Sequence, residues 1–210
     1  MFNTITIDTE TMDVKPSAVI LSIGGFAFNI QDVKGVQSSI LEIARNPEQA
    51  NYSPAAFYGL VDTFCQLMQG RTVSAQTQQW WQKQEEEAHE ALAGQREPLS
   101  QALVSLTAWI QQHPDARIFF RGTDFDGSIL ENAYRTCGLT CPWHFAGKRD
   151  VRTYIDAMVK GTKGYLPRTH QPCFAMVKHH SLHDAMNDAE QMAIAYLVNT
   201  GLAADVGGKE

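Results

Sequence analysis

Near its N-terminus the chain reads Ile5-Thr6-Ile7-Asp8-Thr9-Glu10-Thr11. Apolar and polar residues alternate in this stretch, which is typical of a β-strand with one face turned to a core. Asp8 and Glu10 therefore share a face of the strand. Two neighbouring carboxylates repel each other, and a shared proton or a bound cation relieves the repulsion. On these residues alone, an ordinary solvated strand end is the competing interpretation.

The composition is that of a chain with one sizeable core. It has 210 residues, of which 44% are hydrophobic, and a net charge of −6. We expect a single domain over residues 1–202, with a helical insertion at about 54–112 and a frayed tail at 203–210. The sequence contains neither a leader peptide nor an apolar run of membrane-spanning length, so a cytoplasmic protein with no membrane partner is expected. The acidic balance gives the chain as a whole no attraction for nucleic acid.

The pattern along the chain predicts strands first and then alternating helices and strands. Strands are expected at 5–11, 18–29, 36–43, 116–121 and 148–153, and helices at 54–69, 74–93, 98–112, 126–137 and 184–200. The first three strands predict an antiparallel meander, and the whole order predicts an α/β domain with a mixed sheet. Gly24 and Gly25, inside the second apolar run, indicate a bulge or a close backbone approach.

Further acidic residues stand where a site at a sheet edge needs them. Asp126 follows the strand that ends at Arg121, and α/β sheets place ligands at such junctions, although an Asp there is more often a helix cap. Asp188 lies in the last helix. Positions five apart on a helix differ by about 140° in direction, so His183 cannot face the same way as Asp188 from inside it. We therefore predict that His183 precedes the helix and that Asp184 caps it. Taken alone, a histidine in this His-rich segment is more often a surface residue.

The order and spacing of these residues resemble the DEDDh class of 3′-to-5′ exonucleases. That class carries Asp-x-Glu on its first strand, Phe-Asp or Tyr-Asp at a mid-chain helix and His-x-x-x-x-Asp at its last helix. The matching residues are Asp8 and Glu10, Phe125 and Asp126, and His183 and Asp188. The resemblance extends to a phage and prophage branch, exoribonuclease-like or exodeoxyribonuclease VIII-like, through residues 7–12, 20–24, 80–81, 121–134 and 149–153. One departure is Thr123-Asp124, where relatives often carry Asn or Ser.

The resemblance implies an RNase H-like fold, in which an antiparallel three-strand meander is followed by alternating helices and strands, with helices on both faces of the mixed sheet. It also implies a metal-dependent exonuclease that hydrolyses phosphodiester bonds of RNA or DNA from the 3′ end and releases nucleoside 5′-monophosphates. Two Mg²⁺ ions, with Mn²⁺ as a substitute, would be held by Asp8, Glu10, Asp126 and Asp188, because hard cations prefer oxygen ligands. Asp8 would bridge both ions. His183 would be the general base, since the ordinary pKa of histidine is about 6.5.

Partners are less sharply indicated. The expected substrate is single-stranded nucleic acid or a 3′ overhang, contacted by Thr9, Thr11, Met12 and Phe125. Phe125 or Trp81 could stack on a base, but core packing is the preferred interpretation for Trp80 and Trp81. The helices around Trp80 are expected to pair two copies into a homodimer. Two other functions stay open at this point: a non-catalytic nucleic-acid or protein-binding module that retains the fold, and a DNA-trimming nuclease of different polarity.

Overall fold

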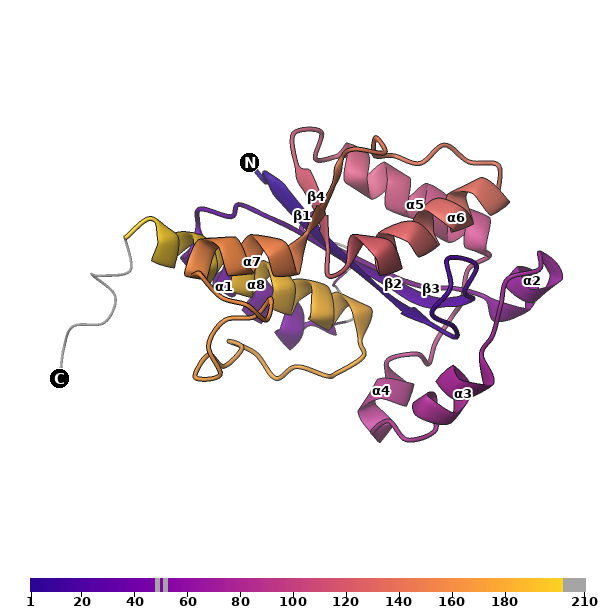
Figure 1. Ribbon diagram of the computed structural model, residues 1–210. Coiled ribbons are helices and arrows are strands. Elements are labelled where there is room, and N and C mark those ends of the chain that lie inside the picture. Colours follow the sequence, from indigo (N-terminus) through magenta and orange to yellow (C-terminus); the bar gives the residue numbers. More distant parts are fainter. Residues whose placement is uncertain (48–49, 51–52, 202–210) are drawn as a thin grey trace.

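The computed structural model describes residues 1–47, 50 and 53–201, so the tail predicted at 203–210 lies outside the described residues. Within this part of the chain five strands form one mixed sheet in the order β3-β2-β1-β4-β5 (Figure 1). The strands are β1 Thr4–Thr11, β2 Ile20–Phe28, β3 Ala56–Leu60, β4 Arg117–Phe120 and β5 Lys148–Asp150. β1 is antiparallel to β2 and parallel to β4, and β2 is antiparallel to β3. The strand that carries Asp8 and Glu10 is therefore the central one.

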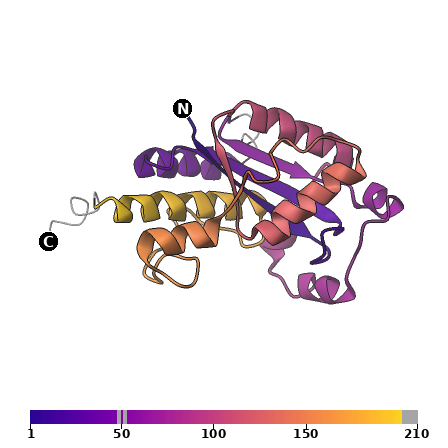
Figure 2. The same cartoon turned by 45° about the horizontal axis from the view of Figure 1, so that its top comes forward.

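Helices cover both faces of the sheet, as the sequence predicts (Figure 2). One face carries α5 Leu99–Gln111 and α6 Ser128–Thr136, and the other carries α1 Val33–Arg45, α7 Val151–Val159 and α8 Ser181–Asn199. The short helices α2 Thr63–Met68, α3 Ala75–Trp81 and α4 Glu86–Glu90 lie beyond the end of the sheet where β1 and β2 are joined (Figure 1). Among the described helices, none has the length and apolar character needed to cross a bilayer.

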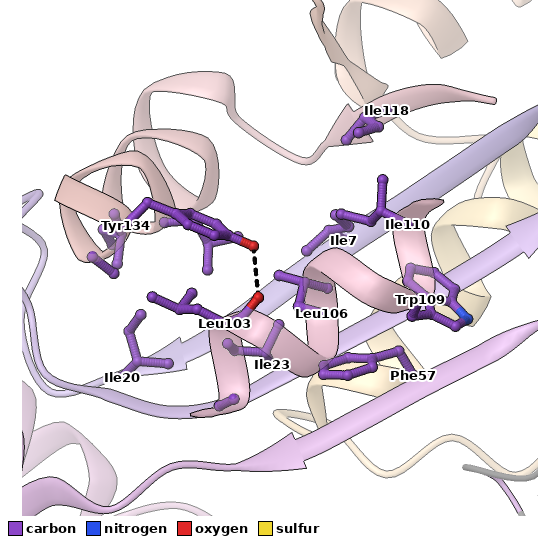
Figure 3. Packing of buried hydrophobic residues seen from close by; sticks show 14 of the residues in the cluster. Ile7, Ile20, Ile23, Phe57, Leu103, Leu106, Trp109, Ile110, Ile118 and Tyr134 are labelled. Atoms are coloured by element: carbon purple, nitrogen blue, oxygen red, sulfur yellow. Dashed lines mark hydrogen bonds between the residues drawn. The ribbon is translucent and has the colours of Figure 1, made fainter. Parts of the chain in front are cut away.

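The alternation along β1 sends its two sets of side chains to different layers. Ile7 packs with Leu103, Leu106 and Tyr134 in the core beneath α5 and α6, where the Tyr134 hydroxyl donates to the Leu103 carbonyl at 3.1 Å (Figure 3). On the opposite face, the Thr6 hydroxyl donates to the Ala185 carbonyl of α8 at 2.8 Å. Asp8 and Glu10 have the same parity as Thr6, so β1 directs both carboxylates toward the layer that contains α8.

The predicted third strand at 36–43 is wrong, because this segment is part of α1. Its buried residues Val36, Ile40 and Ile43 are spaced by four and three, which is the spacing of one helical face. Asp32 caps the helix by accepting a hydrogen bond from the Gly35 N–H at 2.9 Å. The antiparallel meander exists, but β3 supplies its third strand and α1 lies between β2 and β3.

Two predicted helices within the insertion also need correction. The segment 54–69 begins with strand β3, which pairs with β2 from Ala56 to Leu60, and becomes helical only in α2, where Asp62 accepts from the Cys65 N–H. The segment 74–93 divides into α3 and α4. The helices predicted at 98–112 and 126–137 are confirmed as α5 and α6, with the latter preceded by a π-helical turn over Thr123–Gly127.

Gly24 allows α8 to lie directly against the sheet. It pairs with Asp8 in the ladder between β1 and β2. A Cβ atom at Gly24 would lie 2.2 Å from the backbone nitrogen of Leu182 and from the carbonyl carbon of Ser181. This confirms the predicted close backbone approach, whereas the bulge in this pair of strands lies between Glu10 and Thr11.

We predict that Gly24→Ala lowers the free energy of unfolding by at least about 3 kcal/mol, because the added methyl group meets backbone that cannot rotate away. Gly59→Ala on β3 is the matched control, since its Cβ would meet only the Phe57 ring at 3.5 Å. Urea unfolding followed by circular dichroism measures both variants. Equal stability of the two would contradict this role for Gly24.

Candidate active site

A cavity of about 640 Å³ opens at the carboxyl end of β1. One side of it is lined by the last four residues of β1, Asp8, Thr9, Glu10 and Thr11. The other walls come from Arg121 and the π-helical turn after β4, from α3, from Arg152 of α7, and from residues around the start of α8. Stretches that are far apart in the sequence therefore meet at the end of the central strand.

Asp126 reaches the cavity from the π-helical turn Thr123–Gly127, which follows β4. Its side chain is 2% exposed, and its Oδ1 accepts hydrogen bonds from the Thr9 N–H at 3.1 Å and the Thr9 hydroxyl at 2.7 Å. β1 thereby fixes the Asp126 carboxylate beside Asp8. In this position Asp126 is a residue of the site and does not cap α6, whose N-cap is Gly127.

The first turn of α8 contributes Asp184, and the residues before it contribute His179. Side-chain ligand atoms of Glu10, His179 and Asp184 lie within 4.8 Å of one another. The backbone N–H of His179 lowers the pKa of Asp184, against the larger effect of burial. His179 has a φ of 61°, in the left-handed region that residues other than glycine rarely adopt. Such backbone strain is often retained where it aims a side chain at a functional site.

His183 lies elsewhere, and the prediction that it precedes the last helix is wrong. α8 begins at Ser181 with His180 as its N-cap, so His183 is inside the helix and Asp184 does not cap it. The His183 Nδ1 atom accepts from the Val177 N–H at 3.0 Å. Its ring stacks on the His180 ring, with centroids 4.2 Å apart. These contacts direct His183 into the packing around the helix start and not into the cavity.

Asp188 is one helical turn beyond Asp184 and is 4% exposed. It forms an ion pair with Arg121, whose Nη2 and Nε atoms lie 2.6 and 2.7 Å from the Asp188 Oδ1. Tyr165 covers the Arg121 guanidinium, with its ring centroid 4.1 Å from Cζ. Arg121 opposes the rise in the pKa of Asp188 that burial causes. Asp188 is thus ion-paired with Arg121, although its charge still raises the pKa values of Asp8, Asp126 and Asp184.

The carboxylates that line the cavity have raised pKa values. Burial, with the added charge of Asp184 and Asp126, raises the pKa of Glu10 to about 9. Burial is also the main cause that raises the pKa of Asp126 and of Asp184, each to about 7. Burial and the charges of Asp126 and Asp184 hold the pKa of Asp8 well above its ordinary range. A cation bound beside such carboxylates lowers their pKa values again, because it stabilises their charged forms.

This donor set fits a hard divalent cation. Such ions take carboxylate oxygens as ligands, and the charge of Asp8, Glu10, Asp126 and Asp184 is gathered where the sheet ends. Burial and the neighbouring Lys178 lower the pKa of His179, so its imidazole is neutral at neutral pH. The site therefore combines cation ligands with a group that accepts a proton.

Most of the predicted substrate contacts border the cavity. Thr9, Thr11 and Phe125 line it, whereas Met12 packs against the small core that contains Trp81. Asp124, the departure from the family pattern, is exposed to solvent. The sequence reasoning missed Trp80 as a cavity residue, and it missed His179 and Asp184 although they too are separated by five positions. A second cavity, of about 770 Å³, lies between the segment 161–172, which includes Lys163 and Arg168, and Asn187 and Gln191 of α8, and none of these carboxylates lines it.

Comparison with known proteins identifies the fold and the family. The sequence profile of the 3′-5′ exoribonuclease Rv2179c-like domain matches residues 3–196. A solved structure described as the nuclease domain of 3′hExo, a DEDDh family member, bound to rAMP, matches with a TM-score of 0.57 at 12% identity, over 100% of this chain and 98% of that chain. This likeness confirms the predicted RNase H-like fold. No curated protein sequence matches the chain.

We expect stability in the presence of a chelator to fall as the pH rises from about 7 to about 9. The folded-state pKa of Glu10, about 9, lies above its ordinary value of 4.5, so the stability this group contributes at low pH is lost as the pH rises toward 9. The lowered pKa values of His180 and His183 act in the opposite direction, but only below the ordinary histidine value of 6.5. Thermal unfolding across this range measures the effect. Glu10→Gln should flatten the profile, and a wild-type profile that rises would contradict it.

We also expect Asp184→Asn and Asp188→Asn to differ in their response to a divalent cation. With Mg²⁺ or Mn²⁺ at a hundredfold excess over Kd, binding stabilises the wild type by about 2.7 kcal/mol, or about 5 to 10 °C in Tm. Asp184→Asn should lose most of that increase. Asp188→Asn should keep it but lower the stability in chelator by about 2 to 3 kcal/mol, because Arg121 loses its charged partner. The reverse pattern would make Asp188 the metal ligand, as the sequence predicts.

Proposed function

The chain belongs to the Rv2179c-like 3′-5′ exoribonuclease domain family, and on that premise we propose its function. It is a 3′-5′ exonuclease of the DEDDh class. It releases nucleoside 5′-monophosphates from the 3′ end of RNA with the help of two divalent cations. One observation carries the proposal. Asp8, Glu10, Asp126 and Asp184 line a single cavity together with a histidine. Such a cluster can hold the cations that two-metal phosphodiester hydrolysis uses, because an anionic nucleophile must approach a phosphate that is already negatively charged.

Mg²⁺ is the proposed cofactor, with Mn²⁺ as a substitute. Asp8, Glu10, Asp126 and Asp184 are the residues that would hold it, with Asp8 in the middle of the set by its place on β1. The cations supply charge neutralisation for the attacking and leaving oxygens of the phosphodiester. Thr9 holds the Asp126 carboxylate in a fixed orientation, and the backbone N–H of His179 favours the charged form of the Asp184 carboxylate.

His179 is the proposed general base. It lies beside Glu10 and Asp184, and its lowered pKa leaves a ring nitrogen free to accept the proton of the attacking water. It precedes α8, which is where the sequence argument required the base to be, and it stands five residues before Asp184. The assignment from sequence, His183 with Asp188, shares that spacing. We prefer the first pair because it lines the cavity, whereas Asp188 is ion-paired with Arg121.

RNA is the proposed substrate because the matching family is described as exoribonuclease-like. We propose that the substrate enters as a single strand or a 3′ overhang, with Arg152 at the rim of the cavity near its phosphates. Arg152 is exposed to solvent and donates from Nη1 to the Arg121 carbonyl at 2.8 Å, so its position beside the site is fixed. A cytoplasmic location, a homodimer and the phage-related branch stay predictions from the sequence.

The test is incubation of the protein with 5′-labelled single strands and 3′-overhang duplexes of RNA and of DNA, with Mg²⁺, with Mn²⁺ and with chelator. We expect progressive shortening from the 3′ end that requires metal, with RNA strands degraded faster than DNA strands of the same sequence. Faster degradation of DNA would make DNA, and not RNA, the substrate class. Shortening from the 5′ end would overturn the proposed polarity. Absence of metal-dependent release from every strand would overturn the enzymatic proposal.

Two variants in the same assay assign the base. His179→Ala should lower kcat by about a hundredfold or more while the metal-induced rise in Tm remains, because general-base catalysis contributes about 10²- to 10⁴-fold. His183→Ala should keep a kcat within about threefold of the wild type, since its ring packs against His180 outside the cavity. Loss of turnover in His183→Ala alone would restore the assignment from sequence.

A further inference from the structure

The second cavity, between the segment 161–172 and α8, is lined by charges of one sign. Lys163 and Arg168 stand on its walls, and no acidic residue among the described residues lines it. Neither of the two side chains forms an ion pair within the described part of the chain. In a protein with a net charge of −6, two unpaired cations on the walls of one cavity indicate an anionic ligand.

Two other side chains of the second cavity have hydrogen-bonding atoms that the fold does not use. Gln191 is 4% exposed, and its Oε1 accepts from the Leu166 N–H at 3.3 Å, whereas its Nε2 donates to none of the described residues. The Nε2 atom of His170 is buried and also lacks a hydrogen-bond partner among them. Both residues line the cavity. Buried polar atoms are normally paired, so these atoms point to a ligand that supplies the missing partners.

The wall that carries Lys163 is held in position by contacts within the protein. The Asp156 Oδ1 atom of α7 accepts from the N–H groups of Lys163 and Gly164, at 3.0 and 2.8 Å. Gly164 has a φ of 68°, and a Cβ atom there would lie 2.4 Å from the Arg152 Cβ, so glycine allows the segment to pack closely on α7. A wall that is already ordered loses less conformational entropy when a ligand binds.

We infer that the second cavity binds a nucleotide. Its volume of about 770 Å³ lies within the range of roughly 300–1,000 Å³ that is typical of small-molecule sites. Lys163 and Arg168 suit the phosphate, and the apolar side chains of Leu166 and Pro167 offer a surface to the ring of the base. The free Nε2 of Gln191 is a donor for the edge of the base. The choice of a nucleotide over another phosphorylated ring compound rests on the proposed function.

Two kinds of nucleotide fit this chemistry: one that is still part of the RNA strand, upstream of its 3′ end, and a free nucleoside 5′-monophosphate. The place of the cavity suits both. Tyr165 lines it and covers the guanidinium of Arg121, and Arg121 in turn lines the active-site cavity. This pair of side chains therefore belongs to the wall between the two cavities. A strand that leaves the active site reaches the second cavity directly, and a released product is formed beside it.

Calorimetric titration with adenosine 5′-monophosphate in the presence of a chelator tests the site without turnover. Without cations, the active-site carboxylates offer nothing to hold a phosphate, so binding reports on the second cavity. Arg168→Ala, at an exposed position, should weaken binding by about tenfold, as expected for the loss of a charge-assisted hydrogen bond. Lys34→Ala, at an exposed position on α1, removes the same charge elsewhere and should bind as the wild type does.

Gln191→Glu in the same titration tests the contact with the base. It keeps the shape of the side chain and an acceptor for the Leu166 N–H, but it removes the Nε2 donor and adds an acid where the ligand is an anion. Binding should weaken by about tenfold or more. Absence of binding by the wild type in chelator would overturn the inference. Unchanged affinity in both Arg168→Ala and Gln191→Glu would overturn it as well.

Kinetics on an RNA dinucleotide and on a longer single strand identify the source of the nucleotide. If the cavity holds part of the strand, Arg168→Ala raises KM for the longer strand by about tenfold and leaves KM for the dinucleotide unchanged. If it holds the free monophosphate, Arg168→Ala changes neither KM, and added adenosine 5′-monophosphate alters the turnover of the wild type more than that of the variant. Either result supports the site.

An equal rise of KM for the dinucleotide and the longer strand would place Arg168 in the active site and overturn the inference. The binding assay separates this inference from the proposed function. If the wild type releases no nucleotide but binds adenosine 5′-monophosphate in chelator, with the expected losses in Arg168→Ala and Gln191→Glu, the proposed function fails and the nucleotide site stands.

Discussion

The contact between Gly24 and the start of α8 is the constraint on which the site depends. Gly24 is the ladder partner of Asp8, and its missing side chain lets the backbone of Ser181 and Leu182 reach the sheet. A hydrogen bond between the hydroxyls of Ser22 and Ser181, 3.0 Å apart, also joins β2 to the start of α8. Asp184 follows within the same turn of helix. The distance between the N-terminal strand and the C-terminal helix is therefore set by backbone packing, which side-chain motion cannot relax.

The chain stabilises its buried carboxylates in different ways. Asp188 has a guanidinium partner in Arg121, and Asp126 accepts hydrogen bonds from Thr9. Asp8 and Glu10 instead face other acidic groups, which raise their pKa values in addition to the effect of burial. Carboxylates gathered without a cationic partner lower the free energy of unfolding, and a cation bound beside them would raise it again.

Much of the fold follows from local patterns, whereas the exact set of site residues does not. The alternation from Ile5 to Thr11 predicts both the central strand and the shared face of Asp8 and Glu10. The strand predicted at 36–43 is wrong because a short apolar run fits a strand or a helix. Only the spacing of Val36, Ile40 and Ile43 distinguishes the helix from the strand. The stretch His179 to Asp188 contains the His-x-x-x-x-Asp spacing twice. Sequence alone cannot choose between the two, because the choice depends on where α8 begins and on the ion pair that Arg121 forms.

The way α3 is attached has a consequence for the motion of the protein. α3 and α4 are short, and each buries a single residue, Trp81 and Ala88 respectively. Local opening costs least where few apolar contacts are lost, so this segment should exchange its amide hydrogens sooner than the central sheet. The Trp81–Thr11 hydrogen bond attaches α3 to β1, so α3 forms a more mobile wall of the cavity beside carboxylates that the sheet holds in place. The carboxylates at the end of β1 thus stay ordered while the α3 wall of the cavity has the freedom to move.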